Sequence, residues 1–193
     1  MNFLLTISKK THKMNNMKEY IKQQMADTIR RFRMPRYDEL PNQGLYLEQT
    51  TQYINHVMAP LGCMELTSSM ISNYVKKGII ASPIKKLYYR EQIAYLFYIT
   101  IAKNVLSLEH IQLLREMQEK SYPKEIAYNY LCDEFENMLF FVFGIKDSFE
   151  KIGYTSSDEK FLFREVITAA TSSIHLTSWF NAMQTEEKNR GEF

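Results

Sequence analysis

The apolar residues of this chain recur at α-helical spacing along most of its length, and runs that alternate strictly between apolar and polar residues are absent. Glycine and proline are scarce, at 6 and 5 in 193 residues, so few positions would break a helix. We therefore expect an all-α protein whose last helix is long, about 40 Å. The periodic segments and their end signals predict helices over residues 14–33, 45–57, 67–77, 90–104, 107–120, 123–143 and 156–184.

One short segment in the middle of the chain carries clear signals for both ends of a helix. Thr67 is placed to cap the start, because its hydroxyl can accept from an unpaired first-turn N–H group. Gly78 can end the helix in a left-handed conformation. Ile71, Tyr74 and Val75 fall on one side of this helix. The opposite side carries small polar and basic residues, namely Ser69, Ser72, Asn73 and Lys76.

Charge is distributed unevenly, although the net charge is only +2. Residues 1–36 carry nine Lys or Arg against two acids, whereas residues 91–193 carry ten bases against sixteen acids. Residues 66–90 contain no carboxylate and five bases. Those bases are Lys76, Lys77, Lys85, Lys86 and Arg90. This concentration of positive charge predicts a polyanionic partner for one face of the protein.

A simpler interpretation of the same residues stays open. A short surface helix ordinarily presents polar side chains to solvent, and lysines near its C-terminus interact with its dipole. The basic cluster at residues 30–36 also has two interpretations. It contacts phosphate or membrane lipid, or it caps and solvates the C-terminus of the helix before it.

The order of the elements favours a winged helix-turn-helix. A helix over 45–57, a break at 59–62, the central helix, a short basic turn and another helix follow one another. The helix over 90–104 is apolar on nearly every side and must be covered on two faces. We predict a basic N-terminal arm and helix, a winged helix-turn-helix domain, and a helical dimerisation or effector region, over residues 1–36, 37–120 and 121–193.

Two features of the C-terminal half allow alternative interpretations. The small residues 169–173 in the long helix either form a dimer interface or pack inside their own chain. The aromatic residues between Tyr122 and Phe143 either line a pocket for a small-molecule effector or form plain core. We expect a homodimer in which this half receives a signal from a small molecule or a protein.

The motifs of familiar enzymes are missing from the sequence. It has no Gly-rich phosphate loop, no Gly-x-Ser-x-Gly elbow and no His-Glu-x-x-His pair, and its four histidines are isolated. We therefore expect no catalytic activity, no cofactor and no metal site. Two distant cysteines, no secretory signal and no membrane span lead us to expect a cytoplasmic protein without a membrane partner.

A longer pattern of residue types runs from Leu66 to Met117. It consists of Thr67, Ile71, Tyr74, Gly78, Ile79, Ile80, Pro83, Lys85, Lys86, Leu87, Tyr88, Glu91, Ile93, Ser107, Leu108, Glu109, His110 and Ile111. In type and spacing these residues resemble the DNA-binding head of MerR-type regulators. The resemblance implies sequence-specific binding of double-stranded DNA and extends the predicted site to Tyr88. The chain departs from the MerR pattern in a longer connection between the first two helices, a shorter basic turn, and Ser72 where an arginine is usual.

Residues 37–55, 68–78 and 87–94 carry a second resemblance. They are similar to the bacterial domain-of-unknown-function family 1836, and the resemblance covers the chain from about Tyr37 to its end. It implies a cytoplasmic protein with a helix-turn-helix head, and it brings no established activity.

These observations lead to one hypothesis and one alternative. The hypothesis is a homodimeric transcriptional regulator whose central helix enters the DNA major groove, with Ser69, Ser72 and Asn73 at base edges. Phosphates would be held by Lys76, Lys77, Lys85, Lys86 and Arg90. The alternative is a winged-helix adaptor that binds protein and never touches DNA, and that exposes an apolar patch on this helix instead of a basic one.

Overall fold

The computed structural model describes residues 18–62, 65–149 and 157–189, and most of them are helical. The N-terminal helix covers residues 18–29 of this part. The other elements are η1 (Tyr37–Glu39), β1 (Leu45–Tyr46), α2 (Leu47–Met58), η2 (Ala59–Leu61), α3 (Ser68–Lys76), β2 (Leu87–Tyr88), α4 (Arg90–Ala102), α5 (Leu108–Ser121), α6 (Lys124–Val142) and α7 (Asp158–Asn189). The predicted helical fold is confirmed, and a two-stranded ladder of β1 and β2 is added to it.

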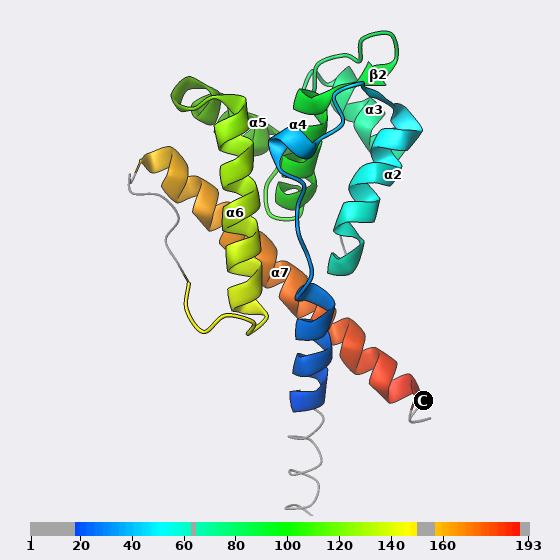
Figure 1. The fold of residues 1–193 in the computed structure, drawn as a ribbon, viewed down its shortest axis with the longest axis vertical. Coiled ribbons are helices and arrows are strands. Elements are labelled where there is room, and N and C mark those ends of the chain that lie inside the picture. Colours follow the sequence, from blue (N-terminus) through cyan, green and yellow to red (C-terminus); the bar gives the residue numbers. More distant parts are fainter. Residues whose placement is uncertain (1–17, 63–64, 150–156, 190–193) are drawn as a thin grey trace, which may run out of the picture.

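Helix α4 lies at the centre of the molecule, between α2 and α6 (Figure 1). It packs against α2 on one side and against α6 and α7 on the other, so nine of its thirteen residues are buried. The expectation that this helix is covered on two faces is confirmed. The physical reason is that its apolar residues surround the helix axis, so that no single face could bury them.

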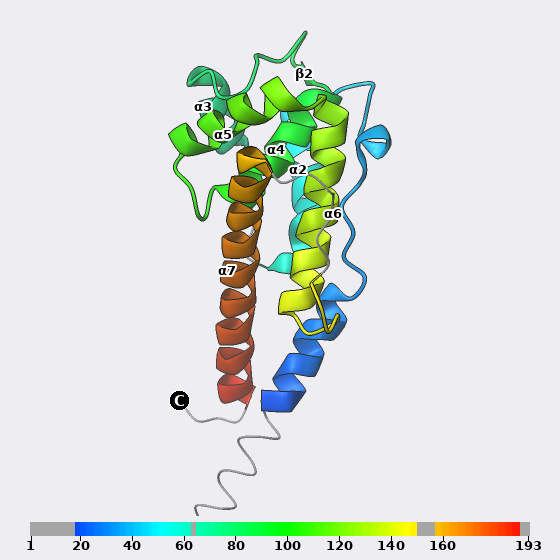
Figure 2. The same cartoon turned by 90° about the vertical axis from the view of Figure 1, so that its left-hand side faces the viewer.

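The C-terminal half consists of three helices. Figure 2 shows α6 and α7 running along each other, with α5 lying across their upper ends. Ser157 caps α7, because its Oγ accepts from the backbone N–H of Lys160 at 3.4 Å. With 32 residues α7 is about 48 Å long, which exceeds the predicted length by more than a turn.

The N-terminal helix lies near the C-terminal end of α7 (Figure 1, Figure 2) and buries Ile21, Met25 and Ile29 in the core. The linker that follows is fastened to α6 by Arg36. The guanidinium of Arg36 lies 2.9 Å from Asp133 Oδ1 and 2.7 Å from Glu136 Oε1. Its pKa is raised, first by the hydrogen bond with Glu136.

Most of the predicted helix ends are confirmed. Thr67 and Ser107 cap α3 and α5 by accepting from the N–H groups of Met70 and His110. Gly78 and Gly144 follow α3 and α6 with φ of +71° and +68°, which suits a residue without Cβ. Four boundaries differ. The N-terminal helix ends at residue 29 and not at 33, residues 45–46 form β1 and not the start of α2, and α7 continues to Asn189. Pro123 is the N-cap of α6 and not its first helical residue.

One continuous hydrophobic core joins residues from all three predicted segments, from Ile21 to Ile174. The small residues of α7 take part in it, since Ala170 and Thr171 are buried inside their own chain. In the described part of the chain, none of the helices combines the length and the apolar character that crossing a membrane requires.

Candidate nucleic-acid interface

The position of α3 is fixed by side chains of α2. Asn55 Nδ2 donates to the carbonyl oxygen of Leu66 at 2.7 Å, and the N–H of Leu66 donates to Asn55 Oδ1 at 2.9 Å. One turn earlier on α2, the hydroxyl oxygen of Thr51 lies 3.1 Å from that of Ser68. The amide thus satisfies the backbone of a fully buried residue just before the N-cap of α3, and the start of α3 is held against α2.

The sequence of α3 gives it one buried and one open face. Ile71 and Tyr74 are buried against the core, at 0% and 4% exposure. After Gly78 the chain turns back, and the N–H groups of Ile79 and Ile80 both donate to the carbonyl oxygen of Tyr74. The exposed residues of α3 are Ser69, Ser72, Asn73 and Lys76, and Lys77 is exposed directly after it.

Only some of the polar groups on this face are available to a ligand. Ser72 Oγ donates to the carbonyl oxygen of Ser68 at 2.9 Å, so its lone pairs are the groups left for a ligand. Lys77 lies close enough to Glu109 to contribute to the lowering of the pKa of that carboxyl. Hydrogen bonds from the Glu109 backbone and from Ser107 lower it more. One carboxylate therefore flanks the basic end of α3.

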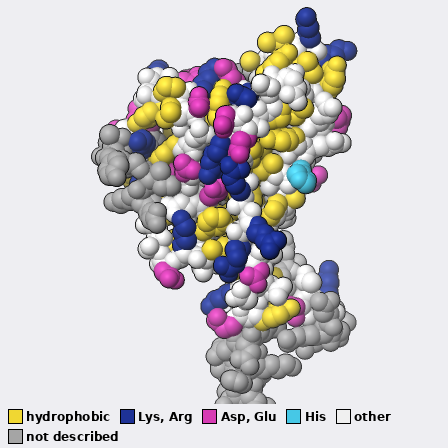
Figure 3. Space-filling model, in the orientation of Figure 1, with side chains coloured by type: hydrophobic (Ala, Val, Ile, Leu, Met, Phe, Trp, Pro, Cys, Tyr) yellow, Lys and Arg dark blue, Asp and Glu magenta, His cyan; other side chains and the backbone are white. Residues whose placement is uncertain are grey.

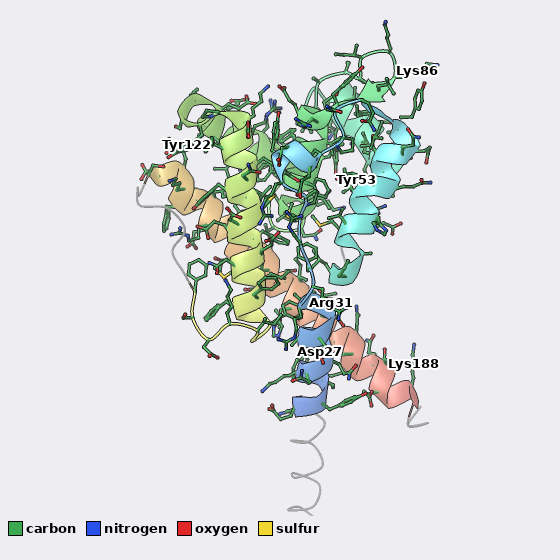
Figure 4. The ribbon with its side chains drawn as sticks, in the orientation of Figure 1. Asp27, Arg31, Tyr53, Lys86, Tyr122 and Lys188 are labelled. Carbon is green, nitrogen blue, oxygen red and sulfur yellow. The ribbon has the colours of Figure 1, made fainter. Side chains whose placement is uncertain are left out.

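The basic turn is a tight hairpin. The N–H of Ile84 donates to the carbonyl oxygen of Leu87 at 3.1 Å, and the reverse bond measures 2.9 Å. Lys85 and Lys86 form its tip with φ of 50° and 68°, a combination that Asn-Gly adopts more readily than Lys-Lys. Figure 3 shows Lys or Arg side chains projecting from the upper tip of the molecule, where Figure 4 labels Lys86.

Two predicted site residues, Tyr88 and Arg90, are not part of the exposed surface of α3 and the hairpin tip. Tyr88 is only 4% exposed, because β2 pairs with β1 and turns this ring into the core. Arg90 donates from Nε to the carbonyl oxygen of Leu40 and from Nη2 to that of Asp38. Its guanidinium also lies 5.6 Å from the centre of the Tyr37 ring. Tyr88 therefore offers DNA no surface, and Arg90 is used to hold the linker.

The N-terminal basic cluster also finds carboxylates. Arg30 lies 3.5 Å from Asp27 on its own helix, and Arg33 lies 3.0 Å from Glu39. With the two ion pairs of Arg36, these contacts favour a structural role for the cluster. Figure 3 shows basic and acidic side chains mixed in the same way in the middle of the face that it draws.

Two residues that the sequence did not single out hold the connection between α3 and the hairpin. Gln92 Nε2 donates to the carbonyl oxygens of Ala81 and Ser82, at 2.8 and 3.3 Å. Arg115 Nη1 donates to the carbonyl oxygen of Ile79 at 3.1 Å. No local signal could have shown them, because their partners are at least ten residues away. Among the described residues, no group of three or more His, Cys, Asp or Glu side chains could hold a metal ion.

Comparison with known proteins gives one match. A family described as Domain of unknown function (DUF1836) matches residues 35–135, which is just over half of the chain and reaches from the linker into α6. No curated protein and no solved structure matches the chain.

Proposed function

The chain belongs to the family described as Domain of unknown function (DUF1836), and we propose that it binds double-stranded DNA through α3 and the basic hairpin. The observation that carries this proposal is the outer face of α3. Its exposed side chains are small, polar and basic, and the 66–90 stretch to which α3 and the hairpin belong contains no carboxylate.

The size and chemistry of α3 suit a major groove. An α-helix with its side chains is about 10–12 Å across, and the groove is about 12 Å wide. Hydroxyl and amide side chains read base edges as donors and acceptors. Ser69 and Asn73 can act as both, and Ser72 offers its acceptor lone pairs. The buried face of α3 is anchored through Ile71 and Tyr74, so the open face is presented by a rigid frame.

The hairpin tip supplies phosphate contacts beside the groove. Lys85 and Lys86 are both exposed, and Lys86 lies at the upper tip of the molecule (Figure 4). Lys76 and Lys77 lie at the end of α3 that leads toward this hairpin. Four lysines around one short helix form the positive rim that non-specific attraction to a DNA backbone needs.

The order of α2, α3, hairpin, α4 and α5 supports a winged helix-turn-helix head of MerR-like type. In this proposal the protein acts in transcription regulation as a homodimer. Exposed apolar residues on the outer side of α7, such as Leu162, Leu176 and Phe180, are available for contact with a second copy. Two heads would then favour half-sites about one helical turn apart, or a multiple of it. Light scattering of the purified chain measures the oligomeric state directly.

The central experiment is a titration of genomic DNA fragments at several salt concentrations. If both hairpin lysines touch phosphate, the variant Lys85→Ala/Lys86→Ala lowers the slope of log affinity against log salt by about one to two units. The matched control is Lys22→Ala/Lys188→Ala, which removes the same charge. Both of its residues are exposed, and Lys188 lies at the opposite end of the molecule from Lys86 (Figure 4).

Equal slopes for the two double variants would contradict the hairpin assignment. A wild-type chain that fails to bind any fragment at low salt would contradict DNA binding itself. A change of Asn73→Ala adds a further test, because a residue at a base edge alters which fragments are selected and leaves the salt slope in place.

A protein-binding adaptor is the second candidate, and one observation favours it. Tyr46 on β1 and Ile84 at the start of the hairpin are 56% and 62% exposed, which is unusual for side chains of this size so close together in the ladder. For an adaptor, Ile84→Ser would abolish binding to a protein partner. For a DNA-binding protein, the same change would leave DNA affinity nearly unaltered.

A further inference from the structure

A pocket of about 160 Å³ lies between α4, α5 and α6, and Phe163 of α7 contributes to its wall. Five of its sixteen lining residues are aromatic. Tyr98 stacks on Tyr95 with 5.9 Å between ring centres, and its other neighbour, Phe163, is 5.8 Å away. A smaller pocket of about 80 Å³ adjoins the first, and Tyr122 and Ala127 line both. Figure 4 labels Tyr122 near the junction of α5 and α6.

Three tyrosine hydroxyls at this pocket make no hydrogen bond of ordinary geometry, although Arg115 and Cys132 lie near those of Tyr95 and Tyr128. They belong to Tyr95, Tyr98 and Tyr128, and among the described residues they account for three of the four buried side-chain atoms in that condition. Tyr98 and Tyr128 are each only 5% exposed. Burial raises the pKa of Tyr98, so its hydroxyl keeps its proton and can donate it to an acceptor. A core without a ligand would gain by replacing such groups with phenylalanine.

The charges around the mouth of the pocket cancel. Lys124 Nζ lies 2.6 Å from Glu91 Oε2, and Arg115 Nε lies 2.9 Å from Glu119 Oε1. The Arg115 guanidinium also covers the ring of Tyr95 at 4.1 Å. Because each cation is already paired with a carboxylate, the entrance has little preference for a charged ligand.

We propose that this pocket binds a neutral, planar aromatic molecule of one or two rings that presents acceptors to the buried tyrosine hydroxyls. The volume of the pocket sets the size of the ligand, because a cavity of about 150 Å³ is large enough for benzene. The adjoining pocket leaves room for a second ring. The stacked rings set the planar shape. No hydrogen bond within the described residues uses the hydroxyl of Tyr98, so a ligand acceptor that reaches it gains a bond the protein leaves unmade.

The pocket is built against the segment that joins α3 to the hairpin. Ile80 and Ala81 of that segment line it, and so do Gln92 and Arg115, which hold the carbonyl groups of the same segment. A ligand that shifts either side chain alters how α3 stands relative to the hairpin lysines. This regulatory consequence rests on the proposed DNA binding, whereas the ligand site itself does not.

In the test, two probes are titrated into the full chain without DNA. Binding of each probe is measured by ligand-observed NMR and by calorimetry. The first probe is 4-hydroxybenzamide, which is neutral, planar and rich in acceptors. The second is benzene, which has the ring alone. We expect 4-hydroxybenzamide to bind at least tenfold more tightly than benzene. The variant Tyr98→Phe should weaken its binding about fivefold to tenfold, which is the usual effect of one hydrogen bond.

Two further variants make the result decisive. Ala127 lines both pockets, so the longer side chain of Ala127→Met occupies space in them and should abolish binding of 4-hydroxybenzamide. Tyr20→Phe makes the same chemical change at an exposed tyrosine of the N-terminal helix and should leave binding unchanged. Without ligand, Tyr98→Phe should keep or raise the unfolding temperature, because it deletes an unpartnered hydroxyl.

The proposal is overturned if 4-hydroxybenzamide fails to bind the wild type, or if it binds Tyr98→Phe equally well. A fall in the unfolding temperature of Tyr98→Phe would also overturn it, because the hydroxyl would then be bonded within the protein. Addition of 4-hydroxybenzamide to a DNA titration examines the regulatory consequence separately. Failure of DNA binding in that titration leaves the result of the probe experiment intact.

Discussion

The fully buried carboxylate of Glu134 on α6 is held by the guanidinium of Arg164 on α7. Arg164 Nη2 and Nε donate to Glu134 Oε1 at 2.6 and 3.2 Å, and the hydroxyl of Tyr130 donates to the same oxygen at 2.7 Å. The other oxygen, Oε2, is buried and has no partner among the described residues. This pair ties the two longest described helices together next to the aromatic pocket.

Removing the guanidinium should destabilise the fold strongly. Arg164→Ala leaves a buried carboxylate without its cation, and we expect a loss of about 3 kcal/mol or more in the free energy of unfolding. Urea unfolding measures it. Glu165→Ala, at the exposed neighbouring position, should change the stability by less than about 0.5 kcal/mol. The double variant Glu134→Leu/Arg164→Met should recover much of the loss, and equal instability of the single and double variants would contradict this account.

The amide of Asn55 should control the helix-turn-helix geometry. Asn55→Ala leaves the N–H and the carbonyl group of the buried Leu66 without partners, so we expect a loss of about 2 kcal/mol in stability. A weaker affinity for DNA should accompany it, because α3 is no longer held at its start. His56→Ala removes the exposed neighbouring side chain and is the control for both measurements. A stability for Asn55→Ala that matches the control would show that water replaces the amide.

The two lysines at the hairpin tip should lower the stability of the fold while they strengthen DNA binding. Two non-glycine residues with positive φ cost about 1 kcal/mol each, and Asn-Gly suits such a turn better. We expect Lys85→Asn/Lys86→Gly to raise the free energy of unfolding by about 1–2 kcal/mol and to weaken DNA binding to the level of Lys85→Ala/Lys86→Ala. Unfolding in urea and the salt titration measure the two effects. A variant that is less stable than the wild type would contradict the strain assigned to this turn.

His175 should make the fold sensitive to mild acid. Its ring meets Phe143 edge-on, with 5.0 Å between ring centres, and burial lowers its pKa below 6.5. The unfolded chain therefore takes up the proton first as the pH falls, and the folded state loses stability below about pH 6.5. The loss ends once the pH passes below the lowered pKa of the folded state.

His175→Gln should flatten this part of the stability curve, measured by urea unfolding between pH 5 and 8. His56→Gln, at an exposed position on α2, should leave the curve in place. The assignment fails if the two variants show the same dependence on pH.

The elements that the sequence predicted best are those whose signals are local. Thr67 and Ser107 cap the helices that follow them, because a hydroxyl reaches an N–H group only three residues away. Gly78 ends α3 for an equally local reason, since only its own φ is involved. The division of α3 into a buried and an exposed face follows from helical periodicity, so Ser69 and Asn73 lie outward as predicted.

The sequence by itself therefore determined the helices, most of their ends and the polar, basic face of α3, because each depends on residues within one or two turns. Only the tertiary structure decided the rest. Tyr88 is buried because β1 pairs with its strand, and Arg90 faces a linker fifty residues earlier in the chain. The pocket around Tyr98 is lined by residues of α4, α5, α6 and α7, so it exists only where these four helices meet. Such contacts depend on where distant segments pack, and no local pattern of residues records that.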